Sequence, residues 1–344
     1  MKKIILPLFV FFMASAVHSS NSLVNYAAID SLALKGIDLV HQNQFQEALE
    51  VLKKIINNYP EEPAGYFFTA AAYQTLIDSY RNEKYKKEFE NYIEIAIQKA
   101  ERKLKNSNPS ALDYFYAGGS VGYRGIYRSF RGNWWGAFWD AGKGKKYLEK
   151  ALELDSTLYD VYYGLGNYHY WRSVKSKILW WLPFFGDQRK KGIEYSKITI
   201  AKGKFAKEEA KYSLVRIYAE EKDYQNVLSW ADSVNQINPR DPQSKWFVGL
   251  AYIEIEKWEE AEKTYQELIS ICKNSPYYDL AAEVEARYQL ALIYYYQKLA
   301  SKAFEQIGFI FANQAEVKNN DYAKFFLEKA KELKKKIDTE LSAK

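Results

Sequence analysis

Apolar and small residues recur along this chain with the spacing of paired amphipathic helices. Residues three and four positions apart share one face of a helix, so a segment with that spacing buries one side against a neighbour. Between residues 208 and 273 the pattern repeats in register, because Tyr218 and Tyr252 lie 34 residues apart and so do Val227 and Ala261. This stretch is therefore predicted to form two successive helix pairs of equal size.

The first helix of each pair carries a small residue whose position can be followed through the chain. These positions are Gly36, Ala70, Gly118, Gly166, Val215, Gly249 and Ala291. The intervals between them are 34, 48, 48, 49, 34 and 42 residues. A small side chain is expected there because the two helices of a pair must approach closely, and Val215 is the exception. The chain is thus predicted to be all-α, with about seven antiparallel helix pairs.

The second to fourth pairs exceed the standard length by 14 or 15 residues. Either their helices are extended or a loop protrudes between them. In the second pair, residues 84–105 form one apolar-periodic run without a helix breaker, which favours longer helices. In the third pair, a helix over residues 111–131 is predicted, followed by a connector at 132–136 and a helix that ends near Leu154. In the fourth pair, the first helix is predicted over residues 158–177.

The helix pairs resemble tetratricopeptide repeats over about residues 23–313. In the sixth pair, Gly249 and Tyr252 match the L-G-x-x-Y part of the tetratricopeptide signature, and Ala261 and Tyr265 match its A-x-x-x-F part. The resemblance implies a right-handed superhelical solenoid whose concave face binds peptides or protein segments. The middle pairs also resemble eukaryotic outer-mitochondrial-membrane and inclusion-body-clearance repeat proteins.

That second similarity is carried by one short segment. Residues 182–189, with the sequence Leu-Pro-Phe-Phe-Gly-Asp-Gln-Arg, are followed by Gly192. The eukaryotic proteins likewise have long middle units. Their activity is poorly defined, so the similarity implies no site residues.

The two ends of the chain differ from the repeats. Residues 1–16 contain two lysines, an apolar run and a final Ala-Ser-Ala, the composition of a secretory signal peptide. Residues 17–22 are predicted to be a flexible mature N-terminus, and residues 314–344 a lysine-rich capping helix and tail. We expect export to the periplasm, with a peripheral position on the outer membrane as an alternative.

Composition argues against several kinds of chemistry. The formal net charge of +6 falls to +4 when the two lysines of the leader are removed, a balance that does not favour nucleic acid. The three histidines form no zinc motif, and the single Cys272 is expected to be a small buried residue. His169 is expected to be a core histidine with a hydrogen bond to a neighbouring tyrosine. No enzyme, cofactor or metal site is predicted.

The most informative feature is an aromatic cluster in the third and fourth pairs, where six of the nine tryptophans lie. Both extra segments follow the first helix of their pair, so they should lie side by side at one edge of the solenoid. The candidate partner-binding residues are Arg124, Arg128, Arg131, Trp134, Trp135, Trp139, Trp171, Trp180, Trp181, Phe184 and Phe185. Either these rings pack on one another and seal the tall units, or they stay exposed as an interface rich in tryptophan and arginine.

Three functions are compatible with this pattern. The first is a non-catalytic scaffold that binds a protein or peptide through its concave face and the Trp/Arg-rich edge. The second is a protein that lies on a membrane surface through the aromatic segment at 178–185, which is flanked by basic residues. The third is a glycan-binding repeat protein that stacks sugars on exposed rings. The pattern does not specify an oligomeric state.

Overall fold

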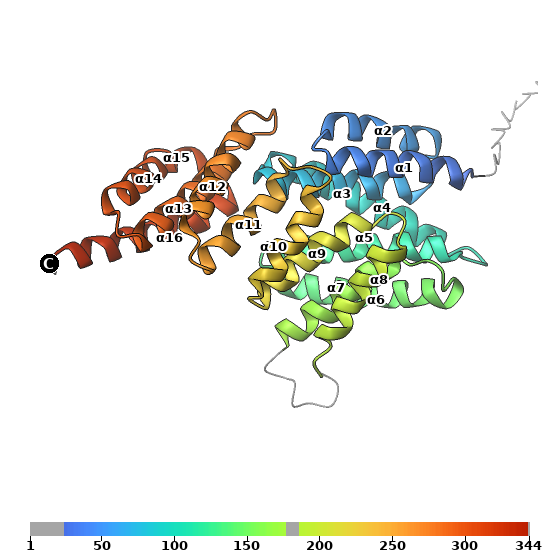
Figure 1. Ribbon diagram of the computed structural model, residues 1–344. Coiled ribbons are helices and arrows are strands. Elements are labelled where there is room, and N and C mark those ends of the chain that lie inside the picture. The colour runs from blue at the N-terminus through green and yellow to red at the C-terminus, as the bar shows by residue number, and fades with distance from the viewer. Residues whose placement is uncertain (1–23, 177–185, 343–344) are drawn as a thin grey trace, which may run out of the picture.

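The computed structural model describes residues 24–176 and 186–342, and this part of the chain is helical, with no strand (Figure 1). The helices form seven antiparallel pairs, which confirms the predicted all-α repeat architecture. The pairs are α1 (Tyr26–His41) with α2 (Phe45–Asn58), α3 (Pro63–Tyr80) with α4 (Lys86–Lys103), α5 (Ala111–Phe130) with α6 (Trp134–Leu154), α7 (Val161–Lys175) with α8 (Arg189–Lys202), α9 (Lys207–Glu220) with α10 (Tyr224–Asn235), α11 (Pro242–Glu254) with α12 (Trp258–Lys273), and α13 (Leu280–Tyr296) with α14 (Ala300–Ala312).

Three shorter or terminal elements complete the chain. The 3₁₀ turn η1 (Glu83–Tyr85) precedes α4, and the short helix α15 (Gln314–Val317) follows α14. The last helix, α16 (Asp321–Ser342), packs on α13 and α14 through a buried stripe that includes Leu327 and Leu333. Its opposite side carries most of its lysines and faces solvent.

The extra length of the third pair lies in its helices and not in a loop. The helices α5 and α6 have 20 and 21 residues, against 14 and 12 in α9 and α10. Residues 131–133 alone connect them, so the predicted connector at 132–136 is wrong. The side-chain oxygen of Asn133 accepts the N–H of Gly136 at 2.9 Å, which caps α6 and places Trp134 and Trp135 in its first turn.

Close helix approach explains the small residues of the repeat, as predicted. A Cβ atom at Gly166 would lie 2.9 Å from the carbonyl oxygen of Gly192, and one at Gly192 would lie 2.7 Å from that of Gly166. In the sixth pair, a Cβ at Gly249 would lie 2.6 Å from the ring of Tyr265. The helices α7 and α8 therefore touch backbone to backbone, which only glycine on both sides permits.

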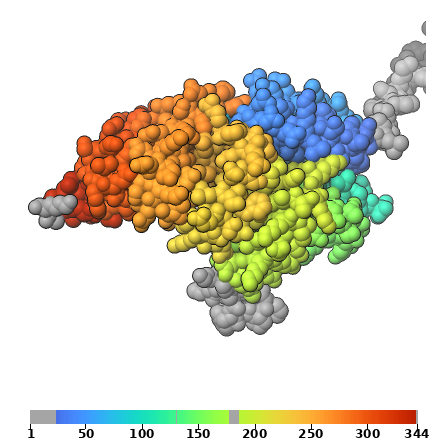
Figure 2. All heavy atoms as spheres, in the orientation of Figure 1, coloured from blue at the N-terminus to red at the C-terminus, as the bar shows by residue number. Residues whose placement is uncertain are grey.

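The superhelix closes on itself across its concave side, where α3 meets α11. The indole Nε1 of Trp246 donates a 3.1 Å hydrogen bond to the carbonyl of Ser79, and the side chain of Asn82 donates to the carbonyl of Tyr277 at 2.9 Å. In the space-filling view, the blue N-terminal pairs adjoin the orange pairs around α11 and α12 (Figure 2). This contact occupies the concave side where α3 and α11 meet.

Arg81 is the centre of this closure. Its backbone is left-handed, with φ of 54°, and its guanidinium donates two hydrogen bonds of 2.7 and 3.1 Å to Glu285 of α13. The same group lies 4.4 Å from the ring centroid of Trp246 and 5.0 Å from that of Tyr322. Its carbonyl accepts from Asn320 at 2.8 Å. One buried cation thus joins the second pair to the sixth, the seventh and α16.

His169 lies in the core, but not with the hydrogen bond expected for it. Its ring packs edge-on against Tyr195, with 5.7 Å between centroids, and its Nδ1 atom has no hydrogen-bond partner among the described residues. Burial, and to a smaller extent the nearby Lys191, lowers the pKa of His169 to about 4. The imidazole is therefore neutral at pH 7.

This shift predicts a loss of stability in acid that depends on His169. The histidine pKa is about 4 in the folded chain, against about 6.5 when unfolded, so only the unfolded chain takes up a proton between these values. Stability should fall as the pH drops through this window. His169→Phe should reduce the loss between pH 7.5 and 4.5 by about 2 kcal/mol, as measured by urea denaturation at both pH values. Equal losses in the two proteins would contradict this assignment.

Candidate functional site

Four aromatic side chains stand on the outer side of α6, in its first two turns. Their exposed fractions are 58% for Trp134, 72% for Trp135, 63% for Phe138 and 59% for Trp139. No other large apolar side chain in the described residues is as exposed. The opposite side of the helix is buried, and Ala137 is its first buried residue. We call these four residues the aromatic ridge.

The rings of the ridge contact one another while remaining exposed. Trp135 stacks on Phe138 with 6.3 Å between centroids, and Trp139 meets both rings edge-on at 5.7 and 5.8 Å. The ammonium group of Lys175, at the end of α7, lies 5.3 Å from the ring of Trp134. From the sequence, packed rings and exposed rings were alternatives. On this helix the rings do both, because they contact one another and remain exposed to solvent.

The predicted arginines lie beside the ridge, bound to internal carboxylates. Arg124 of α5 donates to Asp140 of α6 at 2.7 and 3.0 Å, and to Glu94 of α4 at 2.9 Å. Arg128 donates through Nη1 to Asp140 at 2.8 Å. Asp140 is buried, so its charge needs both guanidinium groups. These ion pairs connect α5 to both α4 and α6.

Arg131, at the end of α5, joins this region to the C-terminal helix. Its Nη1 atom pairs with Glu83 and, at 2.6 Å, with Asp321 at the start of α16. The adjacent carboxylates raise the pKa of the Arg131 guanidinium above its ordinary value, although burial alone would lower it. The cation is therefore permanent.

A hollow of about 420 Å³ lies among these arginines, and we call it the arginine groove. Residues of α4 and α5 and the loop before α6 line it. Tyr127, in its wall, donates a 2.8 Å hydrogen bond to Glu90, and burial together with that carboxylate raises the tyrosine pKa. The full lining is Lys86, Phe89, Glu90, Ile93, Glu94, Arg124, Tyr127, Arg128, Arg131 and Asn133.

The structure separates the eleven predicted site residues into four groups. The three arginines line the groove, and Trp134, Trp135 and Trp139 belong to the ridge. Trp171 is partly buried and packs edge-on against Tyr170, with 5.0 Å between centroids. The remaining candidates, Trp180, Trp181, Phe184 and Phe185, lie outside the described residues. Ridge and groove are neighbours, but none of the ridge residues lines the groove.

Two residues that matter here were not among the candidates. Phe138 completes the ridge, and its spacing of three and four residues from Trp135 and Trp134 was the available signal. Asp140 anchors two arginines, and it is the one carboxylate in residues 134–148. A lone acidic residue on the buried side of this part of the helix indicates a buried partner of opposite charge.

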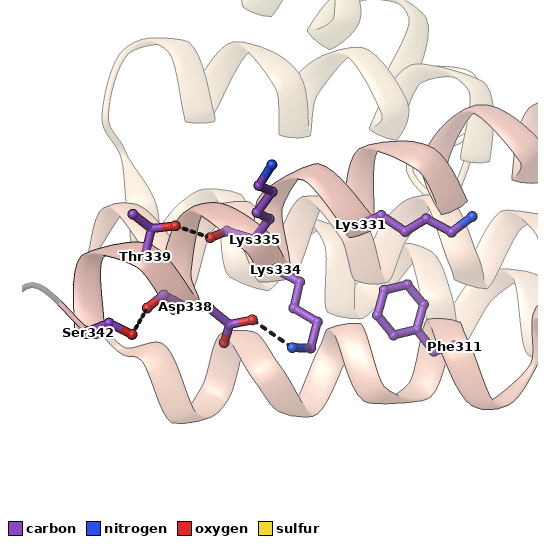
Figure 3. A pocket seen from close by; sticks show the side chains of 7 residues that line it. All are labelled: Phe311, Lys331, Lys334, Lys335, Asp338, Thr339 and Ser342. Atoms are coloured by element: carbon purple, nitrogen blue, oxygen red, sulfur yellow. Dashed lines mark hydrogen bonds and ion pairs between the residues drawn. The ribbon is translucent and has the colours of Figure 1, made fainter.

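A second hollow, of about 650 Å³, lies between α14 and the end of α16 (Figure 3). Lys331 and Lys335 extend from it in different directions, whereas Lys334 pairs with Asp338 at 2.7 Å. The hydroxyl groups of Thr339 and Ser342 donate to carbonyls of their own helix. Its polar groups are largely satisfied locally, so we do not regard it as the site. The remaining lining residue is Phe311.

Clusters of metal ligands and membrane spans are both absent from the described residues. No group of three or more His, Cys, Asp or Glu side chains could hold a metal ion there. Within the same residues, no helix is both long and apolar enough to cross a membrane. Cys272, the one cysteine of the sequence, is buried in α12, where burial raises the pKa of its thiol to about 12.

Comparison with known proteins agrees with this architecture. The tetratricopeptide repeat pattern matches residues 34–62. A TPR repeat-containing protein of Bacillus subtilis, YpiA, is 31% identical over 58 residues, which are 17% of this chain. The chain spans 14% of the length of that relative.

Solved structures share the fold at low identity. The Cut9–Hcn1 hetero-tetramer of the APC/C matches with a TM-score of 0.51 and 11% identity, over 83% of this chain and 52% of the other. The C-terminal part of a TPR repeat-containing protein from Cytophaga hutchinsonii matches with a TM-score of 0.43 and 19% identity, over 86% and 99%. With a matching tetratricopeptide repeat at residues 34–62, seven helix pairs and small residues at the helix contacts, the described residues form a tetratricopeptide-repeat-like solenoid.

Proposed function

We propose that this protein is an exported, non-catalytic scaffold that binds a segment of a partner protein in the arginine groove. Solenoids of this kind present extended surfaces to other chains. Here the concave side is occupied where α3 meets α11, so we place the partner on another surface. The groove is the described hollow that combines arginine, tyrosine and phenylalanine, the side chains that contribute most to binding at interfaces.

Arg128 is the observation that supports this proposal most strongly. A guanidinium group has five N–H donors, and Arg128 directs only Nη1 to Asp140 in the contacts described. Its side chain is 32% exposed, whereas that of Arg124 is 17% exposed. The ion pair holds Arg128 in place before any partner arrives, which reduces the entropy lost on binding. Its outward donors can then bind a carboxylate or carbonyl of the partner.

Site-specific photo-crosslinking tests the groove. A photo-reactive residue at Lys86, in the groove wall, should yield a crosslinked partner in the envelope fraction of the source cells. Arg128→Glu should reduce that product roughly tenfold or more, because a charge-assisted hydrogen bond is replaced by repulsion. Since Asp140 also loses one of its two guanidinium partners in this variant, circular dichroism verifies that the variant folds. The mass of the recovered chain tests export, since cleavage after Ala16 removes residues 1–16.

The same probe at Lys54, on the exposed side of α2, is the matched control. It should not give the product seen from Lys86. Identical products from both positions, or a Lys86 product that Arg128→Glu leaves unchanged, would refute binding in the groove. A recovered chain that retains residues 1–16 would refute export alone.

A further inference from the structure

The aromatic ridge is not explained by the groove. None of its four rings lines the hollow, and each is more than half exposed to water. Exposed apolar clusters of this kind mark contact with another molecule, because water solvates the rings poorly. Three of the four are tryptophans, whose rings combine an apolar body with a polar N–H. Such rings concentrate at the boundary between lipid headgroups and acyl chains.

The exposed charges that follow the ridge on its own helix are positive. The exposed charged side chains on the first four turns of α6 are lysines, since the one carboxylate there, Asp140, is buried and paired. Lys143 and Lys145 pair with Glu101 and Glu149, whereas Lys146 is exposed with no ion pair among the described contacts.

Neighbouring helices extend this basic rim. Lys175 at the end of α7 touches the ridge through Trp134. At the start of α8, Lys190 and Lys191 are exposed as well.

A lipid surface fits this arrangement better than a protein pocket does. The rings stand on the outward side of one helix and contact each other, so they form a protrusion that a soft interface can accept without a matching cavity. Lysines beside an apolar protrusion complement anionic headgroups. We infer that the aromatic ridge docks this protein on an anionic lipid bilayer, with its rings at the headgroup boundary and Lys146 and Lys175 over the phosphates. This inference is independent of the scaffold proposal.

A fluorescent probe on the ridge can test the contact directly. Cys272 is 1% exposed, so a cysteine placed by Phe138→Cys can be labelled selectively with an environment-sensitive dye in the native chain. The dye should shift to the blue with vesicles of phosphatidylcholine and phosphatidylglycerol, and much less with phosphatidylcholine alone. The matched control is Leu341→Cys near the far end of α16, which is 49% exposed, and its dye should not shift.

Co-sedimentation with the same vesicles measures the contributions of the rings and the lysines. Trp135→Ser with Trp139→Ser should weaken binding roughly tenfold or more, whereas Leu341→Ser should not change it. Lys146→Glu should weaken binding to anionic vesicles at least about fivefold, because one favourable surface charge is lost. Circular dichroism of each variant verifies the fold.

Three results would overturn the inference. They are an unchanged dye spectrum with anionic vesicles, equal binding by the ridge and Leu341 variants, and a photo-reactive residue at position 138 that crosslinks to a protein in place of lipid. Because groove and ridge are altered by different substitutions, failure here leaves the crosslinking result at Lys86 standing, and the reverse also holds.

Discussion

Gly192→Ala should destabilise the protein by about 2 to 3 kcal/mol, because α7 and α8 touch backbone to backbone at this position. The added Cβ would lie 2.7 Å from the carbonyl oxygen of Gly166 and 3.0 Å from the backbone nitrogen of Tyr170. Neither atom belongs to a flexible side chain, so the helices must move apart. Urea denaturation followed by circular dichroism measures the change.

Gly142→Ala is the matched control for that substitution. Gly142 lies within α6, and a Cβ there would meet no atom within 4 Å. Alanine should therefore stabilise the protein, by about 0.5 to 1 kcal/mol, because glycine loses more conformational freedom in a helix. If the two substitutions had the same effect, helix contact at Gly192 could not be the cause.

Arg81→Met should have the second large effect, about 3 to 5 kcal/mol of lost stability. The substitution leaves the carboxylate of Glu285 buried without its partner, and uncompensated buried charges cost this much. It also removes the cation between the rings of Trp246 and Tyr322. Hydrogen exchange should rise in both α3 and α11, and urea denaturation gives the total change.

Two further variants measure how much the buried Arg81–Glu285 ion pair contributes. In Arg81→Met with Glu285→Leu no buried charge is left, so the double variant should lose less stability than Arg81→Met alone. Arg102→Met removes an ion pair with Glu61 in which both side chains are more than two-thirds exposed. That change should stay within about 0.5 kcal/mol of wild type. Equal effects of Arg81→Met and Arg102→Met would show that the closure contributes nothing.

The repeat architecture could be predicted because its signals are local. The small residue at Gly166 and its equivalents recurs once per pair, and the structure places it where helices touch. The connector at 132–136 was misplaced because Trp-Trp-Gly resembles a break in a helical pattern. Only the cap geometry of Asn133 shows that the helix already begins at Trp134.

The closure and the arginine groove could not be predicted for a different reason. Arg81 and Glu285 are 204 residues apart, and no period or motif joins them. The arginines were recognised by type, but the sequence does not show that Asp140 binds two of them. Tertiary ion pairs decide which charged groups face outward, and they depend on how far the superhelix turns.

The contact between α3 and α11 also has a mechanical consequence. An open solenoid extends like a spring, because each unit touches only its two neighbours. Here the second and sixth pairs are tied together, so the units between them form a stiff ring. If the two ends of the chain were pulled apart, the contact between α3 and α11 would bear the force before the units between them could extend.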